Sequence, residues 1–285
     1  MDLPYRDFFA LKDEPFSTVP SPRTLFLTSV HSTALEKTAY VVGAKKGLAV
    51  VFGDTGMGKS SLARMLNQKF LDAGFVSVLL TNPSYPTPNS LLRTIAQEFR
   101  TERTDKSFKG MLDIFKQFLY QRALREKKTV VLTIDEAQTL TLPLIELLRM
   151  LSNYESNTEK LLQMVLFGQD QLRTRLAHPR GQSFRSRIAM ASTLEALTAK
   201  ETGQMIVFRW SVASGAGSHP FEPAALRAIF EHSRGVPREA CIIADNSLLL
   251  AYHQRTNPIT SRIVEQVVSD RRAVLRLKEP PDGKK

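Results

Sequence analysis

The feature that most constrains the fold is an apolar run, residues 48–52, that breaks into glycines spaced G-x-x-x-x-G-K-S and then into an amphipathic pattern. This order predicts a strand, a phosphate loop and a helix over residues 59–71. The glycines let the backbone adopt conformations that side chains oppose, so that successive N–H groups point at phosphate oxygens. The start of the helix adds the positive end of its dipole. The predicted nucleotide-binding residues are Gly53, Asp54, Thr55, Gly56, Met57, Gly58, Lys59, Ser60 and Ser61.

Two side chains at the end of this loop carry its expected chemistry. The Lys59 ammonium reaches the β and γ phosphates of a nucleoside triphosphate, and the Ser60 hydroxyl is a ligand for Mg²⁺. Because glycine makes up only about 7 % of residues, an ordinary turn seldom matches this spacing between a strand and a helix. No Asn-Lys-x-Asp sequence for guanine selection is present. We therefore expect ATP and Mg²⁺ as cofactors.

Two further apolar runs end in polar side chains. Residues 129–134 end in Asp135 and Glu136, where open parallel α/β sheets place their ligands. Beside a phosphate loop, Asp135 is expected to hold Mg²⁺ through water, and Glu136 to orient or deprotonate the attacking water; the alternative is that both cap the next helix. Residues 161–168 end in Gln169, which is either a sensor of the γ-phosphate or a plain turn residue.

The segment 171–194 contains five arginines and no acidic residue. Arginine without nearby acidic partners suggests partners elsewhere, either the nucleotide of a neighbouring subunit or a polyanion. Within this segment, Phe184-Arg-Ser-Arg-Ile188 is the part of most interest. Its two arginines are Arg185 and Arg187, and both kinds of partner stay open for them.

From residue 192 onward the pattern predicts helices only, over residues 199–212, 222–233, 237–255 and 260–277. The break Gly235-Val-Pro-Arg238 places Arg238 in the first turn of a helix, where it either reaches across a cleft or lies on the surface. Four parts are predicted: an aromatic and proline-rich lead near the nucleotide site (1–30), an α/β core (31–191), a helical second domain (192–277) and a disordered tail (278–285).

The net charge is +11, from 39 Lys and Arg against 28 Asp and Glu, which favours nucleic acid or an acidic surface as partner. A predicted helix over residues 106–128 carries seven basic and two acidic residues. Arg103, Lys106 and Lys109 are the residues expected to face phosphates of duplex DNA, unless the helix is simply solvated on this side. The sequence shows no bilayer-length apolar run and no signal peptide, and its one cysteine, Cys241, favours a cytoplasmic protein.

The order of these parts resembles the AAA+ ATPases, and among them the ExeA/GspA type. The resemblance rests on the lead, residues 5–17, on the two phosphate-site motifs, on Val165-Leu-Phe-Gly-Gln169 and on Gly235-Val-Pro-Arg238. It implies a five-stranded parallel core with a helical lid, ATP bound between them, and a ring or helical homo-oligomer. In that arrangement Arg238 is the sensor arginine in cis, and Arg187 or Arg185 is the finger supplied in trans.

The chain is also similar to transposition regulators of the TnsC, TniB and MuB kind. Full-length ExeA-type proteins continue into a transmembrane segment and a peptidoglycan-binding domain, neither of which follows residue 285 here. The first expectation is therefore an ATP-dependent, DNA-associated regulator that recruits a transposase, and the alternative is an ATPase for secretion or envelope assembly that acts through a membrane partner. A switch that binds but barely hydrolyses ATP is the third, which Glu136 argues against.

Overall fold

A computed structural model describes residues 4–215 and 218–275. The chain forms two compact units: Pro20–Glu195, and Met1–Val19 together with Ala196–Lys285. The predicted lead, residues 1–30, is thus divided between the two units, and the helical unit begins four residues after the predicted boundary. The predicted tail, residues 278–285, lies outside the described residues.

The unit Pro20–Glu195 contains a parallel sheet of five strands in the order β2-β3-β4-β1-β5. This confirms the predicted α/β fold class. The residues of β1, β3 and β4 are all buried, as their unbroken apolar runs predict, whereas the residues of β5 alternate between half-buried and exposed. The strands are β1 (Leu48–Phe52), β2 (Val76–Leu80), β3 (Val130–Ile134), β4 (Leu162–Gly168) and β5 (Ile188–Thr193).

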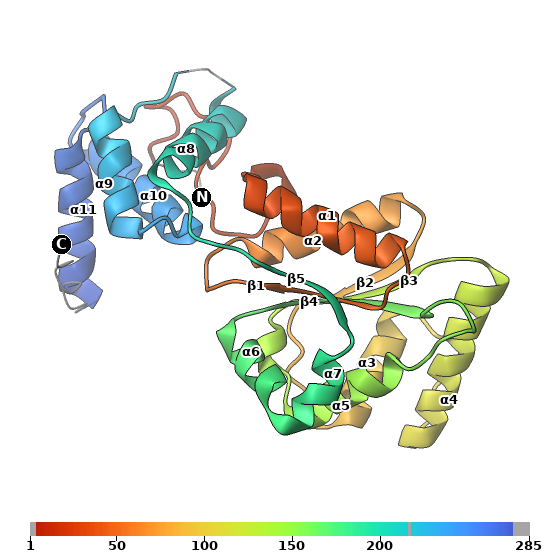
Figure 1. The fold of residues 1–285 in the computed structure, drawn as a ribbon. Coiled ribbons are helices and arrows are strands. Elements are labelled where there is room, and N and C mark those ends of the chain that lie inside the picture. Colours follow the sequence, from red (N-terminus) through yellow and green to blue (C-terminus); the bar gives the residue numbers. More distant parts are fainter. Residues whose placement is uncertain (1–3, 216–217, 276–285) are drawn as a thin grey trace. The chain divides into compact units, whose positions relative to one another are not determined.

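Helices cover both faces of this sheet (Figure 1). Two lie on one face, and the others pack on the opposite face, where a large buried apolar cluster fills the space beneath the strands. The first face carries α1 (Ser29–Gly43) and α2 (Lys59–Asp72); the second carries α3 (Pro88–Glu98), α4 (Phe108–Leu119), α5 (Leu142–Leu151), α6 (Asp170–Ala177) and α7 (Gln182–Arg185). Short turns of other helix types are η1 (Pro22–Thr24), η2 (Tyr120–Arg125), η3 (Ala137–Thr139) and η4 (Pro179–Gly181), of which η2 is a π-helix.

Threonine caps the start of two of these helices. The N-cap of α1 is Thr28, and its hydroxyl accepts the N–H of His31. The N-cap of α3 is Thr87, Pro88 occupies the first helical position, and Ser90 completes a capping box.

The helical unit consists of α8 (Ala199–Ser214), α9 (Pro223–Ser233), α10 (Pro237–His253) and α11 (Ser261–Leu275). Gly235 fixes the turn before α10. Its φ is +74°, and a Cβ there would lie 2.0 Å from the carbonyl oxygen of Leu197. No other residue type fits this close approach.

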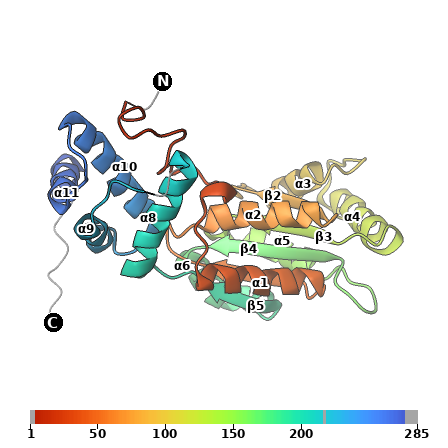
Figure 2. The ribbon, with the colours of Figure 1, turned by 90° about the horizontal axis from the view of Figure 1, so that it is seen from above.

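Residues 4–19 belong to this helical unit, beside α8 and α10 (Figure 2). The backbone N–H groups of Lys12 and Asp13 donate to the Ala213 carbonyl, and the Tyr5 hydroxyl donates to Asp245. The ring of Phe9 packs edge-on against Trp210. Among the described residues, none of the helices has both the length and the apolar composition required to cross a bilayer.

Candidate nucleotide site

The phosphate loop joins the carboxyl end of β1 to the first residue of α2. Gly56 and Gly58 have φ values of +84° and +86°, which lie in the left-handed region that glycine adopts without strain. A Cβ on Gly58 would lie 3.5 Å from Leu25 Cδ1 and 3.6 Å from His31 Nε2, so side chains pack closely behind the loop. The loop therefore has the backbone shape of a phosphate cradle.

His31 supports this loop, a role that the sequence analysis did not predict. The imidazole is buried; Nε2 lies 3.3 Å from the Met57 carbonyl oxygen and Nδ1 lies 2.8 Å from the Thr28 hydroxyl. Because a carbonyl only accepts, Nε2 carries the proton, and the hydroxyl donates to Nδ1 in the neutral ring. No motif surrounds His31 in the sequence, so nothing there indicated this role.

The residues predicted to bind phosphate and Mg²⁺ meet at the ends of β1 and β3. Lys59 is buried, and its Nζ donates to the Asp54 carbonyl at 2.8 Å. The pKa of Asp135 is raised above its usual value, because the effect of burial exceeds the opposing effect of hydrogen bonds from the Ser60 hydroxyl and the Glu136 N–H. The Glu136 N–H lies 2.9 Å from Asp135 Oδ1. The structure thus brings Lys59, Ser60 and Asp135 together, as the motif spacing predicts.

Glu136 is held in an unusual backbone conformation, with φ +55° and ψ +34°. A non-glycine residue there is strained, and such strain gathers at functional sites. The Gln138 side-chain amide donates to the Glu136 carboxylate and accepts the Gln169 N–H at 3.2 Å. Gln138, which the sequence analysis overlooked, therefore connects the two predicted catalytic positions, Glu136 and Gln169.

The arginines of residues 171–194 differ in how they are engaged, and three of them have hydrogen-bond partners within the chain, of which one partner is acidic. Arg173 bonds Asp170 at 3.0 Å, and Arg175 donates to the Leu140 carbonyl at 2.9 Å. Arg187 donates to Asn153 Oδ1 at 2.6 Å and to the Ser183 carbonyl at 2.6 Å. Arg185 is exposed, and within residues 4–215 and 218–275 no hydrogen bond or ion pair engages its guanidinium.

Sequence comparison agrees with this geometry. A family described as "AAA domain" matches residues 43–176. The General secretion pathway protein A of Aeromonas hydrophila is 33 % identical over 256 residues, which are 90 % of this chain and 46 % of that protein. Residues 43–176 thus match an AAA domain, and nearly the whole chain is similar to an ExeA/GspA-type protein. The chain spans about half the length of this curated relative.

Solved structures show the same AAA+ fold. The ORC2 protein of Aeropyrum pernix, in ADPNP–ADP complexes, matches with a TM-score of 0.67 and 17 % identity over 91 % of this chain and 72 % of that chain. The Drosophila ORC bound to DNA matches with a TM-score of 0.70 and 16 % identity over 92 % of this chain and 66 % of that chain. The RuvB branch migration motor of Thermotoga maritima matches with a TM-score of 0.55 and 19 % identity over 84 % of this chain and 68 % of that chain.

The sequence predicts four further site residues, one for nucleotide and three for DNA. Arg238 is exposed in the first turn of α10, within the helical unit. Arg103, Lys106 and Lys109 are exposed on the connection between α3 and α4 and on the first turn of α4. Their predicted roles, toward nucleotide and toward DNA, stay predictions.

Proposed function

We propose that this ATPase binds ATP on residues 53–61 and hydrolyses it at interfaces between copies of the chain. The observation that carries the proposal is the assembly of Ser60, Asp135 and Glu136 beside the glycine loop, where the Ser60 hydroxyl and the Glu136 N–H donate hydrogen bonds to Asp135. A hydroxyl and a buried carboxylate at this place suit Mg²⁺, and the two left-handed glycines suit phosphate.

Each residue then has a distinct task. Lys59 would bind the β and γ phosphates. Ser60 and Asp135 would hold Mg²⁺, which neutralises phosphate charge when bound. Glu136 accepts the proton of the attacking water or orients that water. Gln138 orients the Glu136 carboxylate through its amide N–H. Its side-chain oxygen accepts the Gln169 N–H, which keeps Gln169 beside Gln138.

The interface between copies would be completed by an arginine. Arg187 is fixed by Asn153 and Ser183, whereas the exposed guanidinium of Arg185 is available to a neighbour. This favours Arg185 as the residue supplied in trans, with Arg187 supporting the short helix α7. Arg238, exposed on α10, is proposed as the cis sensor.

A dilution series tests the shared site. Turnover per protomer is expected to fall as the protein is diluted, because isolated copies lack the neighbour's arginine. The measurement is ATP hydrolysis per protomer over a wide concentration range, with the oligomeric state followed by light scattering. Constant turnover down to a demonstrated monomer would show that one chain is sufficient.

In the cell we propose that this activity serves secretion or envelope assembly in the cytoplasm, through a membrane partner. The 33 % identity to a general secretion pathway protein supports this function ahead of transposition, which the sequence analysis put first. Because the chain matches only 46 % of that protein, the membrane partner of this chain is a proposal and does not follow from the identity alone.

The second candidate is a DNA-associated regulator that recruits a transposase. The exposed Arg103, Lys106 and Lys109, together with the net charge of +11, favour it. With ATP present, the slope of log affinity for labelled duplex against log salt should fall by about 0.9 for each phosphate contacted. A slope near zero contradicts this candidate.

A further inference from the structure

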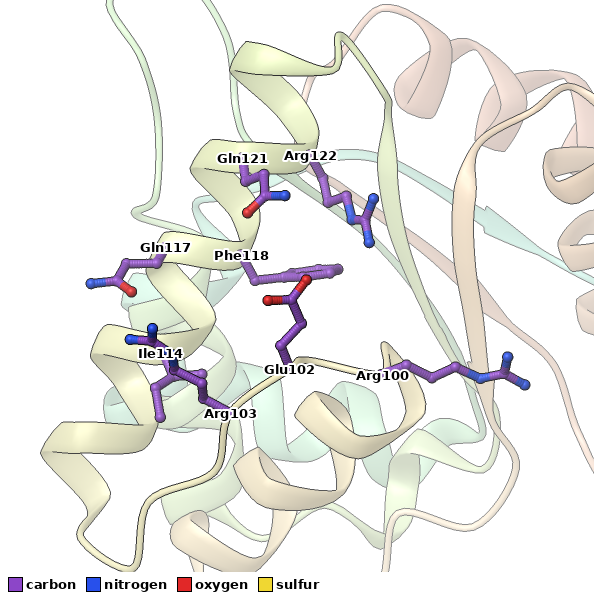
Figure 3. Close-up of a pocket in the computed structure, with 8 residues that line it drawn as sticks. All are labelled: Arg100, Glu102, Arg103, Ile114, Gln117, Phe118, Gln121 and Arg122. Carbon is purple, nitrogen blue, oxygen red and sulfur yellow. The ribbon is translucent and has the colours of Figure 1, made fainter.

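A pocket of about 210 Å³ lies on the α/β unit between the end of α3 and the α4–η2 helix. We call it the arginine pocket. Figure 3 shows the Phe118 ring between Arg122 and Glu102, and Arg100 extending outward at the rim. Its lining residues are Arg100, Glu102, Arg103, Ile114, Gln117, Phe118, Gln121 and Arg122.

Two backbone features shape this pocket. Arg100 follows the C-cap of α3, and its φ of +53° turns the chain into the connection that carries Glu102 and Arg103. At the other side, η2 is a π-helix in which the Glu126 N–H donates to the Gln121 carbonyl at 3.0 Å. Such wide turns are frequent at functional sites.

The pocket combines fixed and free positive charge. The Arg122 guanidinium lies 5.6 Å from the Phe118 ring centroid and pairs with Glu126 at 2.7 Å. Arg100 and Arg103 are exposed, and among the described residues neither guanidinium has a hydrogen bond or ion pair. Two guanidiniums beside the apolar side chains of Ile114 and Phe118 suit a ligand in which carboxylates stand next to apolar groups.

A second hollow continues the surface beyond Gln117 and Gln121, which line both. This hollow is lined also by Lys116, Tyr120 and Arg125, and by the acidic Asp113. An extended segment lying across the two hollows would meet side-chain amides at their shared ridge and basic groups on both sides.

From this combination we propose that the arginine pocket binds an acidic, partly apolar segment of a partner protein. The proposal rests on the proposed function in that such an ATPase acts through a partner. Residues 100–128 contain nine basic and four acidic residues, so the surface is positive but mixed. Glu102 and Asp113 would repel the closely spaced phosphates of a duplex, whereas a peptide meets them with a backbone N–H or a basic side chain. These carboxylates favour protein over DNA.

The pocket is also separated from the nucleotide residues. The η2 helix leads into the amino end of β3, whereas Asp135 and Glu136 follow its carboxyl end. Binding at the pocket is therefore measurable without ATP turnover, so that the peptide proposal and the ATPase proposal succeed or fail separately.

The test is a titration of fluorescent 12-residue peptides against the full chain, followed by anisotropy. One peptide consists of alternating Asp and Glu residues, with Leu at two positions. In the control peptide, Lys and Arg replace Asp and Glu. The acidic peptide is expected to bind, and Arg103→Glu should weaken it about tenfold or more. The matched control is Lys37→Glu, an exposed charge reversal on α1, on the opposite face of the sheet. It should leave binding unchanged.

Three outcomes overturn the proposal. The first is absence of binding by the acidic peptide, and the second is equal weakening by the Lys37 and Arg103 variants, which would mean attraction by net charge alone. The third is a 20-base-pair duplex that displaces the acidic peptide and loses affinity in Arg103→Glu, which would assign the surface to nucleic acid.

Discussion

Replacing Arg185 by alanine is expected to lower ATP turnover of the assembled protein by about 10³-fold or more, because arginines supplied in trans contribute about 10³ to 10⁵ in rate. Arg187→Ala should cost less in turnover and should instead lower thermal stability, since it removes the bonds to Asn153 and Ser183. The measurement is steady-state hydrolysis at saturating ATP and at concentrations where the oligomer persists.

A mixing experiment sharpens this prediction. Arg185→Ala keeps its own phosphate site intact, and Glu136→Gln keeps its arginine intact. When the two inactive proteins are combined, interfaces that join an intact site to an intact arginine should recover part of the turnover. If the mixture stays inactive although mixed oligomers are shown to form, Arg185 does not act in trans.

Glu136→Gln is the second change with a large expected effect. Hydrolysis should fall by about 10² to 10⁴, the usual range for removing a general base, because the amide accepts no proton from water. The affinity for ATP should stay within a fewfold, since Lys59, Ser60 and Asp135 are untouched. Single-turnover rates and fluorescent-nucleotide titrations measure the two separately.

Gln138→Leu is the companion variant. It removes the amide that bonds both the Glu136 carboxylate and the Gln169 N–H. We expect a smaller loss in kcat than for Glu136→Gln and unchanged ATP affinity. An unchanged kcat in Gln138→Leu would mean that Gln138 only supports the turn, and full turnover in Glu136→Gln would remove Glu136 from the mechanism.

The parts of the fold that local pattern determines could be predicted from the sequence. Unbroken apolar runs identify β1, β3 and β4 because these strands are buried on both faces. β5 lies at the sheet edge, where alternating half-exposed positions and arginine-rich surroundings hide its strand character. Only the family resemblance implied a fifth strand.

The site shows the same division. Lys59, Ser60 and Asp135 were predictable because each stands at a fixed place in a short motif. The supporting contacts of His31 and the engagement of Arg187 depend on residues distant in sequence: Met57 lies 26 positions from His31, and Asn153 lies 34 positions from Arg187. No spacing rule reveals such pairs, so the sequence alone left Arg185 and Arg187 equivalent.

The inclusion of residues 4–19 in the helical unit sets the limits of a usable fragment. Trp210 and Phe221 are buried there partly by the rings of Phe9 and Phe16, whose centroids lie 6.1 and 5.8 Å away. A truncation that starts at Pro20 would keep every phosphate-site residue and still bare these aromatic surfaces to water. Expression of the ATPase module without its first nineteen residues would therefore yield an aggregation-prone protein, whatever the state of its nucleotide loop.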